Sequence, residues 1–474
     1  MIEKRKFYID GAWVSPRAAN DFEVIDPATE EACAVISLGA KSDVDEAVAA
    51  ARRAFPSWAA TPLESRIVLL ERLDAIMQRR IGELGEAISL EMGAPIDFAV
   101  SEQAACGPWH MKGFLEGVKH IAWEEPFAEG QIIVREPIGV CGLITPWNWP
   151  VNQIALKVIP ALLAGCTCVL KPSEIAPLSA LIFAECIDEA GFPKGVFNLV
   201  NGDGPTVGEA MSHHPDIDMM SFTGSTRAGA QVFRAAADTV KRVTLELGGK
   251  SPNIIFADAN LEKAVRGGVS HCMENTGQSC NAPTRMLVER PVYDEAVDLA
   301  KRAAESVRVG NPREHGDHIG PLVSQAQFDK VQGLIETAIA EGARLVAGGP
   351  GRPDGMNRGY FVRPTVFADV HNGMTIAREE VFGPVLVMIP FDGEEEAVAI
   401  ANDTPYGLAA YISTADAERG QRVARQLRAG MVRVNGAGLA AGHPFGGYKQ
   451  SGNGREGGRW GIEDFLEVKI VSTR

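Results

Sequence analysis

The sequence predicts an α/β protein built from two mostly parallel sheets. Short apolar runs typical of strands alternate with longer amphipathic segments, and the connections between them are short and carry glycine. The same alternation begins again after residue 250. This pattern is typical of parallel sheets covered by helices on both faces. Because no Pro- or Ser-rich linker separates the two series, we expect them to pack tightly around a shared cleft.

The first series of elements ends near residue 250. Residues Ser42 to Phe55 begin with a Ser/Asp cap and place their apolar side chains on one helical face, and residues 65–90 indicate one or two further helices. A helix is also predicted at 178–190, and a further one after Thr226. The predicted strands lie at 132–134, 140–144, 166–170, 196–200 and 219–223.

The second series predicts another α/β domain. Its helices are expected at 261–272, 293–307, 325–341 and 394–401. Its strands are expected at 253–256, 285–288, 344–347, 365–367, 385–389 and 410–413. Residues 465–471 alternate in polarity and indicate a terminal strand, which needs a pairing partner; a second subunit is one candidate.

Composition excludes several classes of protein. The chain has 474 residues, of which 46% are hydrophobic, so it can form a folded core. Its net charge of −15 makes nucleic acid an unexpected partner. The longest apolar stretch, 158–170, is shorter than the roughly 20 residues of a membrane helix. No signal peptide is recognisable and the eight cysteines form no CxxC pair, so we expect a cytoplasmic protein with reduced thiols.

Three side chains could carry chemistry. Cys280 follows a Gly-containing turn and could attack a carbonyl, although a lone cysteine is more often a buried small hydrophobe. Glu246 stands between two leucines and before two glycines, where an apolar setting would raise its pKa and make it a base; an exposed strand end is the alternative. Asn148 stands between two tryptophans and could donate to an oxyanion, or could form an Asx turn.

Other residues suggest a dinucleotide site at the ends of strands. Lys171 and Glu174 follow a buried strand, where they could hold a ribose. Gly224 and Ser225 connect a strand to a helix, whose N–H groups could bind a pyrophosphate. The loop 202–208 reads GxGxxxG and not the usual GxGxxG, so an ordinary glycine loop is equally compatible with it.

Taken together, the chain resembles the NAD(P)-dependent aldehyde dehydrogenase superfamily along nearly its whole length. The resemblance rests on ordered motifs, which are PWNWP, KPSE, GDGPTVG, SFTGST, LELGGK, GQSC, EEVFGPV and PFGGYKQSGNGRE. It implies a Rossmann-like cofactor domain (1–118 and 138–248), a catalytic α/β domain (249–449) and a small β oligomerisation arm (119–137 and 460–474). It also implies a homo-oligomer, either a dimer or a tetramer.

The resemblance assigns roles to residues. Cys280 is implied as the nucleophile and Glu246 as the base that activates the deacylating water. Asn148 and the backbone N–H of Cys280 would form the oxyanion hole, and Lys157 and Glu456 a proton relay. The implied cofactor residues are Ile144, Thr145, Pro146, Trp147, Lys171, Glu174, Gly204, Gly208, Phe222, Gly224, Ser225, Leu247, Gly248, Glu380 and Phe382. The implied residues of the substrate tunnel are Trp149, Asn152, Leu156, Ser279, Asn281 and Phe445.

The expected reaction is oxidation of an aldehyde to a carboxylic acid. Glu174 would bond a ribose 2′-hydroxyl and repel a 2′-phosphate, which favours NAD over NADP. The base Glu246 favours water over coenzyme A as the acyl acceptor. GQSCNAPTR resembles a bacterial branch that includes enzymes for semialdehydes and for pyridine- or ring-derived aldehydes. An esterase and a non-catalytic NAD-binding protein remain alternatives.

Histidine and arginine residues outside these motifs are not expected to carry chemistry. No metal is expected, because the adjacent His213 and His214 have no carboxylate cluster beside them. His271 is expected to pack on its helix. Arg285, five residues after Cys280, is expected to form a structural ion pair and not to anchor a substrate carboxylate.

Overall fold

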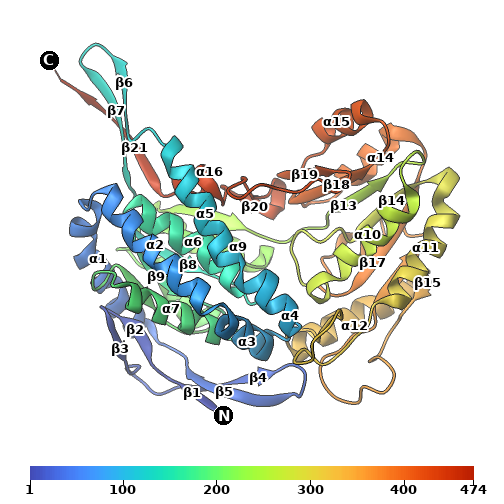
Figure 1. Cartoon of the computed structure of the whole chain (residues 1–474), viewed down its shortest axis with the longest axis horizontal. Coiled ribbons are helices and arrows are strands. Elements are labelled where there is room, and N and C mark those ends of the chain that lie inside the picture. Colours follow the sequence, from blue (N-terminus) through green and yellow to red (C-terminus); the bar gives the residue numbers. More distant parts are fainter. Residues whose placement is uncertain (474) are drawn as a thin grey trace.

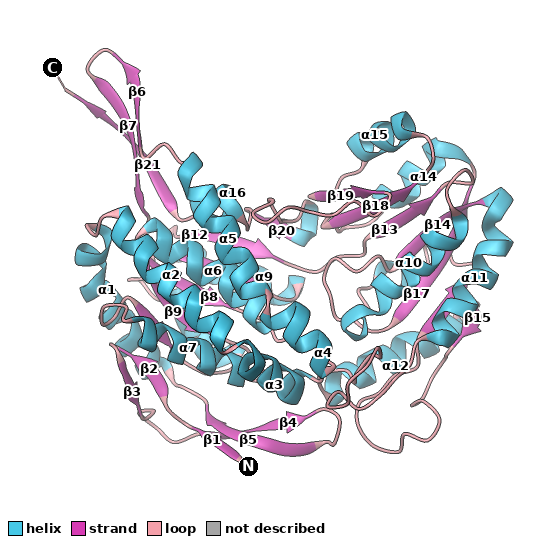
Figure 2. Cartoon of the chain, in the orientation of Figure 1, coloured by secondary structure: helices cyan, strands magenta, loops and turns pink. Residues whose placement is uncertain are grey.

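The computed structural model describes residues 1–473, which form two α/β bodies and a projecting β arm (Figure 1). One body is built on an eight-stranded sheet of order β20-β12-β11-β8-β9-β10-β2-β3. The other is built on a seven-stranded sheet of order β15-β16-β17-β14-β13-β18-β19. Helices cover both sheets (Figure 2). The predicted α/β class is therefore confirmed.

The eight-stranded sheet is parallel from β10 to β12 and antiparallel toward both edges. Its strands are β2 (Phe7–Ile9), β3 (Ala12–Val14), β8 (Val140–Ile144), β9 (Thr167–Lys171), β10 (Phe197–Leu199), β11 (Met219–Thr223), β12 (Arg242–Glu246) and β20 (Gly452–Asn453). Its helices are α1 (Lys41–Ala59), α2 (Leu63–Arg79), α3 (Ile81–Met92), α4 (Ile96–Phe98), α5 (Cys106–Gly117), α6 (Pro150–Ala164), α7 (Leu178–Ala190), α8 (Glu209–His213), α9 (Thr226–Ala236) and α16 (Gly458–Glu463).

The order of these strands creates a crevice. From β8 the chain proceeds through β9 to β10 on one side, and then continues with β11 and β12 on the other side. The direction of winding therefore reverses between β8 and β11. In open α/β sheets, ligands bind outside the carboxyl ends of the strands at such a switch point.

The seven-stranded sheet is parallel except at β15. Its strands are β13 (Pro252–Ile255), β14 (Arg285–Glu289), β15 (Arg344–Ala347), β16 (Thr365–Ala368), β17 (Val385–Phe391), β18 (Ala409–Ser413) and β19 (Met431–Val434). Its helices are α10 (Leu261–Met273), α11 (Tyr293–Ser306), α12 (Gln325–Ala340), α13 (Thr375–Arg378), α14 (Gly393–Asn402) and α15 (Ala417–Gln426). Each predicted element of this half matches one of them within a few residues at each end.

The arm consists of β6 (Glu124–Ala128), β7 (Gln131–Pro137) and β21 (Leu466–Ser472). The tail strand β21 pairs antiparallel with β7, so the partner that this strand needs is present within the same chain. Arg242 on β12 holds the start of β21 in place. Its guanidinium donates to the carbonyls of Asp464 and Leu466 at 2.9 and 2.7 Å and pairs with the Glu467 carboxylate at 2.9 Å.

Some elements were missing from the sequence interpretation. The N-terminal residues form β2, β3 and a small sheet of β1 (Ile2–Lys4), β5 (Glu31–Ser37) and β4 (Asp21–Asp26). Helix α6 is buried on nearly all sides, so it has no polar face to give it a helical period. Within residues 1–473, no helix is long and apolar enough to cross a membrane. The boundaries of the predicted domains stay a prediction.

Glu91 in α3 caps a helix that begins far away in the sequence. Its carboxylate accepts the backbone N–H of Leu178 and that of Ser179, and also the Ser179 hydroxyl at 2.6 Å. The carboxylate thereby satisfies N–H groups that the first turn of α7 leaves free. Burial raises the pKa of Glu91 from 4.5 to about 7.

This raised pKa predicts how stability depends on pH. Below pH 4.5, Glu91 is protonated in both the folded and the unfolded chain. Between pH 4.5 and 7 the unfolded chain ionises first, so the contribution of Glu91 to stability is lost as the pH rises. Relative to Glu91→Gln, we expect the free energy of unfolding of wild type to fall by about 3 kcal/mol over this range, as measured by thermal unfolding at pH 5 to 8. If the difference in unfolding free energy between the two proteins does not change with pH, the raised pKa of Glu91 is contradicted.

Candidate active site

Cys280 lies beyond a tight left-handed turn. Asn275, Thr276 and Gly277 have φ values of 52°, 56° and 71° in succession, a conformation that only glycine adopts without strain. A methyl group at Gly277 would lie 2.0 Å from the carbonyl oxygen of Gly383. The turn lets the chain leave α10 and present Cys280 half-buried between the two sheets, in place of the exposed bend considered from the sequence.

Buried amide side chains hold this turn in place. The Asn275 amide donates to the Asn148 carbonyl at 2.9 Å and accepts from Gln103 at 2.8 Å. Gln278 donates to the Asn275 carbonyl at 3.1 Å and accepts the Val323 N–H at 3.0 Å. This network fixes residues whose backbone conformation is otherwise unfavourable, as is typical of functional sites.

Asn148 is part of the same arrangement. Its side-chain Nδ2 donates to the carbonyl of Gln278 at 2.9 Å, two residues before Cys280. One of the two amide hydrogens is therefore engaged, and the other remains for a further acceptor. Among the described residues, the N–H of Cys280 donates to no carbonyl or side-chain oxygen. Two N–H donors thus remain near the thiol.

Carboxylates surround the thiol of Cys280. Its pKa is raised above the ordinary value of 9.0, first by burial and then by the charges of Glu380, Glu246 and Glu456. The thiol is therefore protonated at neutral pH and needs a base to become a nucleophile.

The predicted base Glu246 ends β12 and is buried. Neither of its carboxylate oxygens has a hydrogen-bond partner in the described chain. Its pKa is raised well above 4.5 by burial and then by the charge of Glu456. An unpaired carboxylate with a raised pKa is a stronger base than an ordinary one.

Lys157 and Glu456 form a buried pair beside Glu246. The Lys157 ammonium donates to Glu456 at 2.5 Å and to the Ser221 hydroxyl at 3.2 Å. The second carboxylate oxygen of Glu456 is buried and unpaired. The positive charge of Lys157 lowers the pKa of Glu246, so the pair moderates its basicity. The residues predicted as base and relay lie together.

The predicted cofactor residues cluster at the switch-point crevice. Most of them occupy the carboxyl ends of β8, β9, β11 and β12 or the residues directly after them. Lys171 pairs with Glu174 at 3.3 Å. Ser225 caps α9 through the N–H of Ala228, and the Thr223 hydroxyl beside it is buried and unpaired. The loop that holds Gly204 and Gly208 forms a short π-helix, η3 (Gly204–Gly208), which lies beside Ile144 and Lys171 at the ends of β8 and β9.

Two more predicted cofactor residues, Glu380 and Phe382, lie in the second body between α13 and β17. Glu380 lies against Gly248, where a methyl group would be 2.3 Å from its carboxylate, and accepts the Gly249 N–H at 2.9 Å. Phe382 has a φ of 60° and meets Trp147 edge to face at 5.4 Å. Gln327 stabilises this backbone, donating to the Phe382 carbonyl at 2.7 Å. The predicted cofactor residues therefore come from both bodies.

The predicted tunnel residues lie along one face of α6 and beside Cys280. The Trp149 indole donates to the Ser279 hydroxyl at 2.9 Å. Asn152 and Leu156 follow at the spacing of successive helical turns. Phe445 pairs through its backbone with Glu456, at 2.8 and 2.7 Å.

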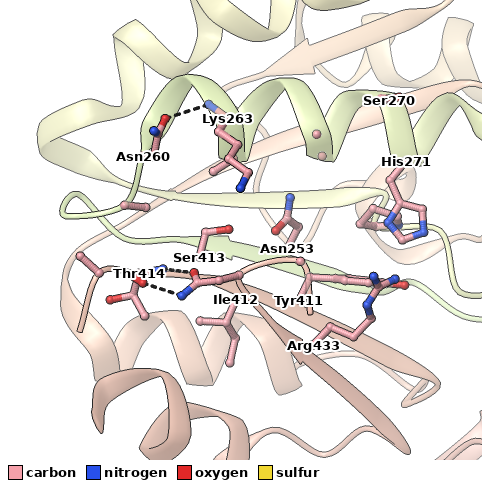
Figure 3. A pocket seen from close by; sticks show the side chains of 18 of the residues that line it. Asn253, Asn260, Lys263, Ser270, His271, Tyr411, Ile412, Ser413, Thr414 and Arg433 are labelled. Atoms are coloured by element: carbon pink, nitrogen blue, oxygen red, sulfur yellow. Dashed lines mark hydrogen bonds between the residues drawn. The ribbon is translucent and has the colours of Figure 1, made fainter. Parts of the chain in front are cut away.

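A separate cavity of about 740 Å³ opens between α10 and the ends of β18 and β19 (Figure 3). None of the predicted catalytic or cofactor residues lines it. It adjoins the site through Tyr411, whose hydroxyl donates to the Asn281 carbonyl at 2.9 Å. The His271 ring meets Tyr411 edge to face, with 5.0 Å between the ring centroids. Among residues 1–473, no cluster of His, Cys, Asp or Glu could hold a metal ion.

Arg285 is structural, but the expected ion pair is wrong. Its guanidinium is buried, with the pKa lowered to about 10 by burial. It donates only to uncharged oxygens, at 2.9 to 3.0 Å, namely those of Lys250, Asn372, Ile400 and Ala401.

Comparison with known proteins identifies the family. A model of the aldehyde dehydrogenase family matches residues 13–471. The chain belongs to the aldehyde dehydrogenase family. The predicted family and the enzyme class, an oxidoreductase acting on aldehydes, are therefore confirmed.

Individual relatives are similar over the whole chain. The 3-succinoylsemialdehyde-pyridine dehydrogenase of a Pseudomonas species is 55% identical over 472 residues, covering 99% of each chain. A solved aldehyde dehydrogenase from Bartonella henselae has a TM-score of 0.98 at 56% identity and covers 100% of both chains. Aldehyde dehydrogenase C from Pseudomonas syringae, solved with NAD⁺ and octanal, has a TM-score of 0.97 at 51% identity, over 99% of this chain and 96% of that one.

Sequence reasoning missed several residues of this aldehyde dehydrogenase. Gln103, Asn275 and Gln327 hold the catalytic turn or the Phe382 backbone, and His110 bonds Asn152. They stand outside the quoted motifs, and their partners are distant in sequence. The available signal was weak, since polar residues within apolar surroundings need hydrogen-bond partners when buried.

The turn yields a test of its own. We expect Gly277→Ala to slow both aldehyde oxidation and alkylation of Cys280 by iodoacetamide, by about 100-fold, because the methyl group displaces the turn. Gly191→Ala is the matched control, since Gly191 has a φ of 80° but open space around its added carbon. Equal effects of the two substitutions would show that the contact with Gly383 is unimportant.

Proposed function

We propose that the protein oxidises an aldehyde to a carboxylic acid with NAD⁺, through a covalent intermediate on Cys280. One observation carries this proposal. Cys280 is a half-buried thiol whose own N–H and one Asn148 amide hydrogen are free, with the unpaired Glu246 carboxylate nearby and the predicted cofactor residues at the adjoining sheet edge. Each of these groups is needed for one step of the reaction.

The first step forms a bond between the Cys280 sulfur and the aldehyde carbon. The thiol proton leaves to a base, and the carbonyl oxygen becomes an oxyanion. Glu246 is suited to accept this proton, because burial and Glu456 raise its pKa. The free hydrogen of Asn148 and the Cys280 N–H would hold the oxyanion, and loss of one such donor costs roughly 3–4 kcal/mol.

Oxidation converts this adduct to a thioester. When bound, NAD⁺ supplies the acceptor for the hydride that leaves the carbon. Lys171 and Glu174 would hold the adenosine ribose, and Glu380 the ribose next to the nicotinamide. Phe382 and Trp147 would wall this end of the crevice and exclude water.

Hydrolysis completes the cycle. Glu246 would first release the thiol proton and would then take a proton from a water molecule, whose oxygen bonds to the thioester carbon and expels the Cys280 thiolate. The carboxylic acid then leaves, and the thiolate is protonated again. Glu456 has a free oxygen and bonds Lys157, so these two could carry the proton away from Glu246.

The relatives support the cofactor and the substrate class. The Pseudomonas syringae structure contains NAD⁺ and octanal, and the Pseudomonas dehydrogenase is named for an aldehyde bearing a pyridine ring. We propose an uncharged aldehyde with a long or ring-bearing chain for this enzyme. The arm exposes Phe127, Val468 and Ile470, which supports the expected homo-oligomer.

The mechanism predicts distinct effects for two variants. Cys280→Ala should abolish NADH formation at 340 nm with every aldehyde. Glu246→Gln should slow the first turnover of NADH, because Cys280 loses the base that takes its proton, and should slow the steady state by 10²- to 10⁴-fold, because thioester hydrolysis loses the same base. The wild-type steady-state rate should fall as the pH drops toward the raised pKa of Glu246, because only the ionised carboxylate accepts a proton.

Two outcomes would contradict this mechanism. Turnover by Cys280→Ala would exclude the covalent intermediate. Hydrolysis of esters without NAD⁺ at rates above aldehyde oxidation would favour the esterase alternative.

Cofactor choice gives a separate test. We expect a higher kcat/KM with NAD⁺ than with NADP⁺, because the Glu174 carboxylate would repel a 2′-phosphate. Glu174→Gln should lower the ratio of kcat/KM with NAD⁺ to kcat/KM with NADP⁺ about tenfold. The control Glu262→Gln replaces an exposed residue of α10 and should leave this ratio unchanged. A wild-type preference for NADP⁺ would overturn the assignment of Glu174.

A further inference from the structure

Asn152 is exceptional within α6. It is the single residue of Pro150–Ala164 that is not buried. Trp149, Asn152 and Leu156 share one helical face, because they are spaced by three and four residues. The bond from Trp149 to Ser279 turns this face toward the catalytic turn. The Asn152 side chain therefore borders the space that leads to Cys280.

His110 on α5 holds one end of the Asn152 amide. Its Nε2 lies 2.6 Å from the Asn152 Oδ1, and its ring meets Trp109 edge to face, with 4.9 Å between the ring centroids. His110 is buried, and burial lowers its pKa to about 4, so the ring is neutral at pH 7. A neutral ring facing an amide oxygen must carry its proton on Nε2 and donate.

The other end of this amide is free. The Asn152 Nδ2 donates to no protein atom among residues 1–473. It is also not one of the polar atoms that are fully buried without a hydrogen-bond partner, so it can be reached from outside. Its two hydrogens are therefore available to a molecule in the passage. With the ring proton on Nε2, the amide oxygen faces His110 and the amide nitrogen faces away from it.

None of the residues predicted to line the substrate tunnel carries a charge. They are Trp149, Asn152, Leu156, Ser279, Asn281 and Phe445. Arg285 has its guanidinium committed to four oxygens. A carboxylate entering here would lose water without gaining a cation, which is costly, whereas a neutral acceptor needs only a donor.

We propose that His110 positions Asn152 to donate a hydrogen bond to a neutral acceptor on the substrate, a ketone oxygen or a ring nitrogen, so that the enzyme prefers uncharged aldehydes bearing such an atom. This inference rests on the proposed function and specifies its substrate class. Asn152 is then a specificity residue and His110 a positioning residue.

The test compares substrates that differ only by a ketone. The measured quantity is the ratio of kcat/KM for an oxooctanal to that for octanal, with the 4-, 5- and 6-oxo isomers placing the ketone at different distances from the aldehyde. For wild type we expect a ratio above one for at least one isomer. Asn152→Leu, of similar size but unable to donate, should lower that ratio about tenfold.

Variants of His110 separate positioning from packing. His110→Phe should lower the ratio, whereas His110→Gln, which keeps a donor near the Nε2 position, should restore most of it. His271→Phe is the matched control, because the half-buried His271 ring also meets an aromatic ring edge to face and also has its pKa lowered to about 4. It should leave the ratio unchanged.

Each possible failure has its own meaning. If no aldehyde is oxidised, the proposed function fails. If octanal is oxidised but no oxo isomer is preferred, or if Asn152→Leu leaves the ratio unchanged, only this inference is overturned. A higher kcat/KM for 5-oxopentanoate than for pentanal would overturn the requirement for an uncharged substrate.

Discussion

The left-handed turn at residues 275–277 is the constraint on which the active site depends. This backbone conformation is unfavourable for Asn275 and Thr276. It is held by hydrogen bonds to buried amide side chains and by close packing against the carbonyl of Gly383. Those contacts come from both bodies. The position of Cys280 is therefore a property of how the two bodies meet, and not of the loop sequence alone.

Burial sets the chemistry at this junction. Cys280 and Glu246 both have raised pKa values, since water is largely excluded and several carboxylates face one another. The ammonium of Lys157 partly offsets that repulsion. A site of this kind holds its proton on the thiol until a substrate arrives, while keeping a strong proton acceptor close by.

Much of this arrangement could be predicted from sequence, and the reasons for the failures are physical. The strands of the second half and the residues at strand ends followed from local pattern, because periodicity and Gly-bearing turns are local signals. Helix α6 has no polar face, so its sequence shows no helical period. The partner of β21 is β7, a strand distant in sequence, so the local pattern could not identify it. An ion pair was predicted for Arg285 because of its charge, but uncharged oxygens accept its hydrogen bonds. The bond between His110 and Asn152 joins two helices, so no short motif could reveal it.

The pair formed by Lys157 and Glu456 joins residues 299 positions apart. During synthesis, the ribosome releases Lys157 long before the segment that carries Glu456, and N-terminal domains generally fold first. The strands from β2 to β12 are then already made, but β20 and this pair are not. Cys280 is therefore present in the nascent chain before the carboxylate that the predicted relay needs.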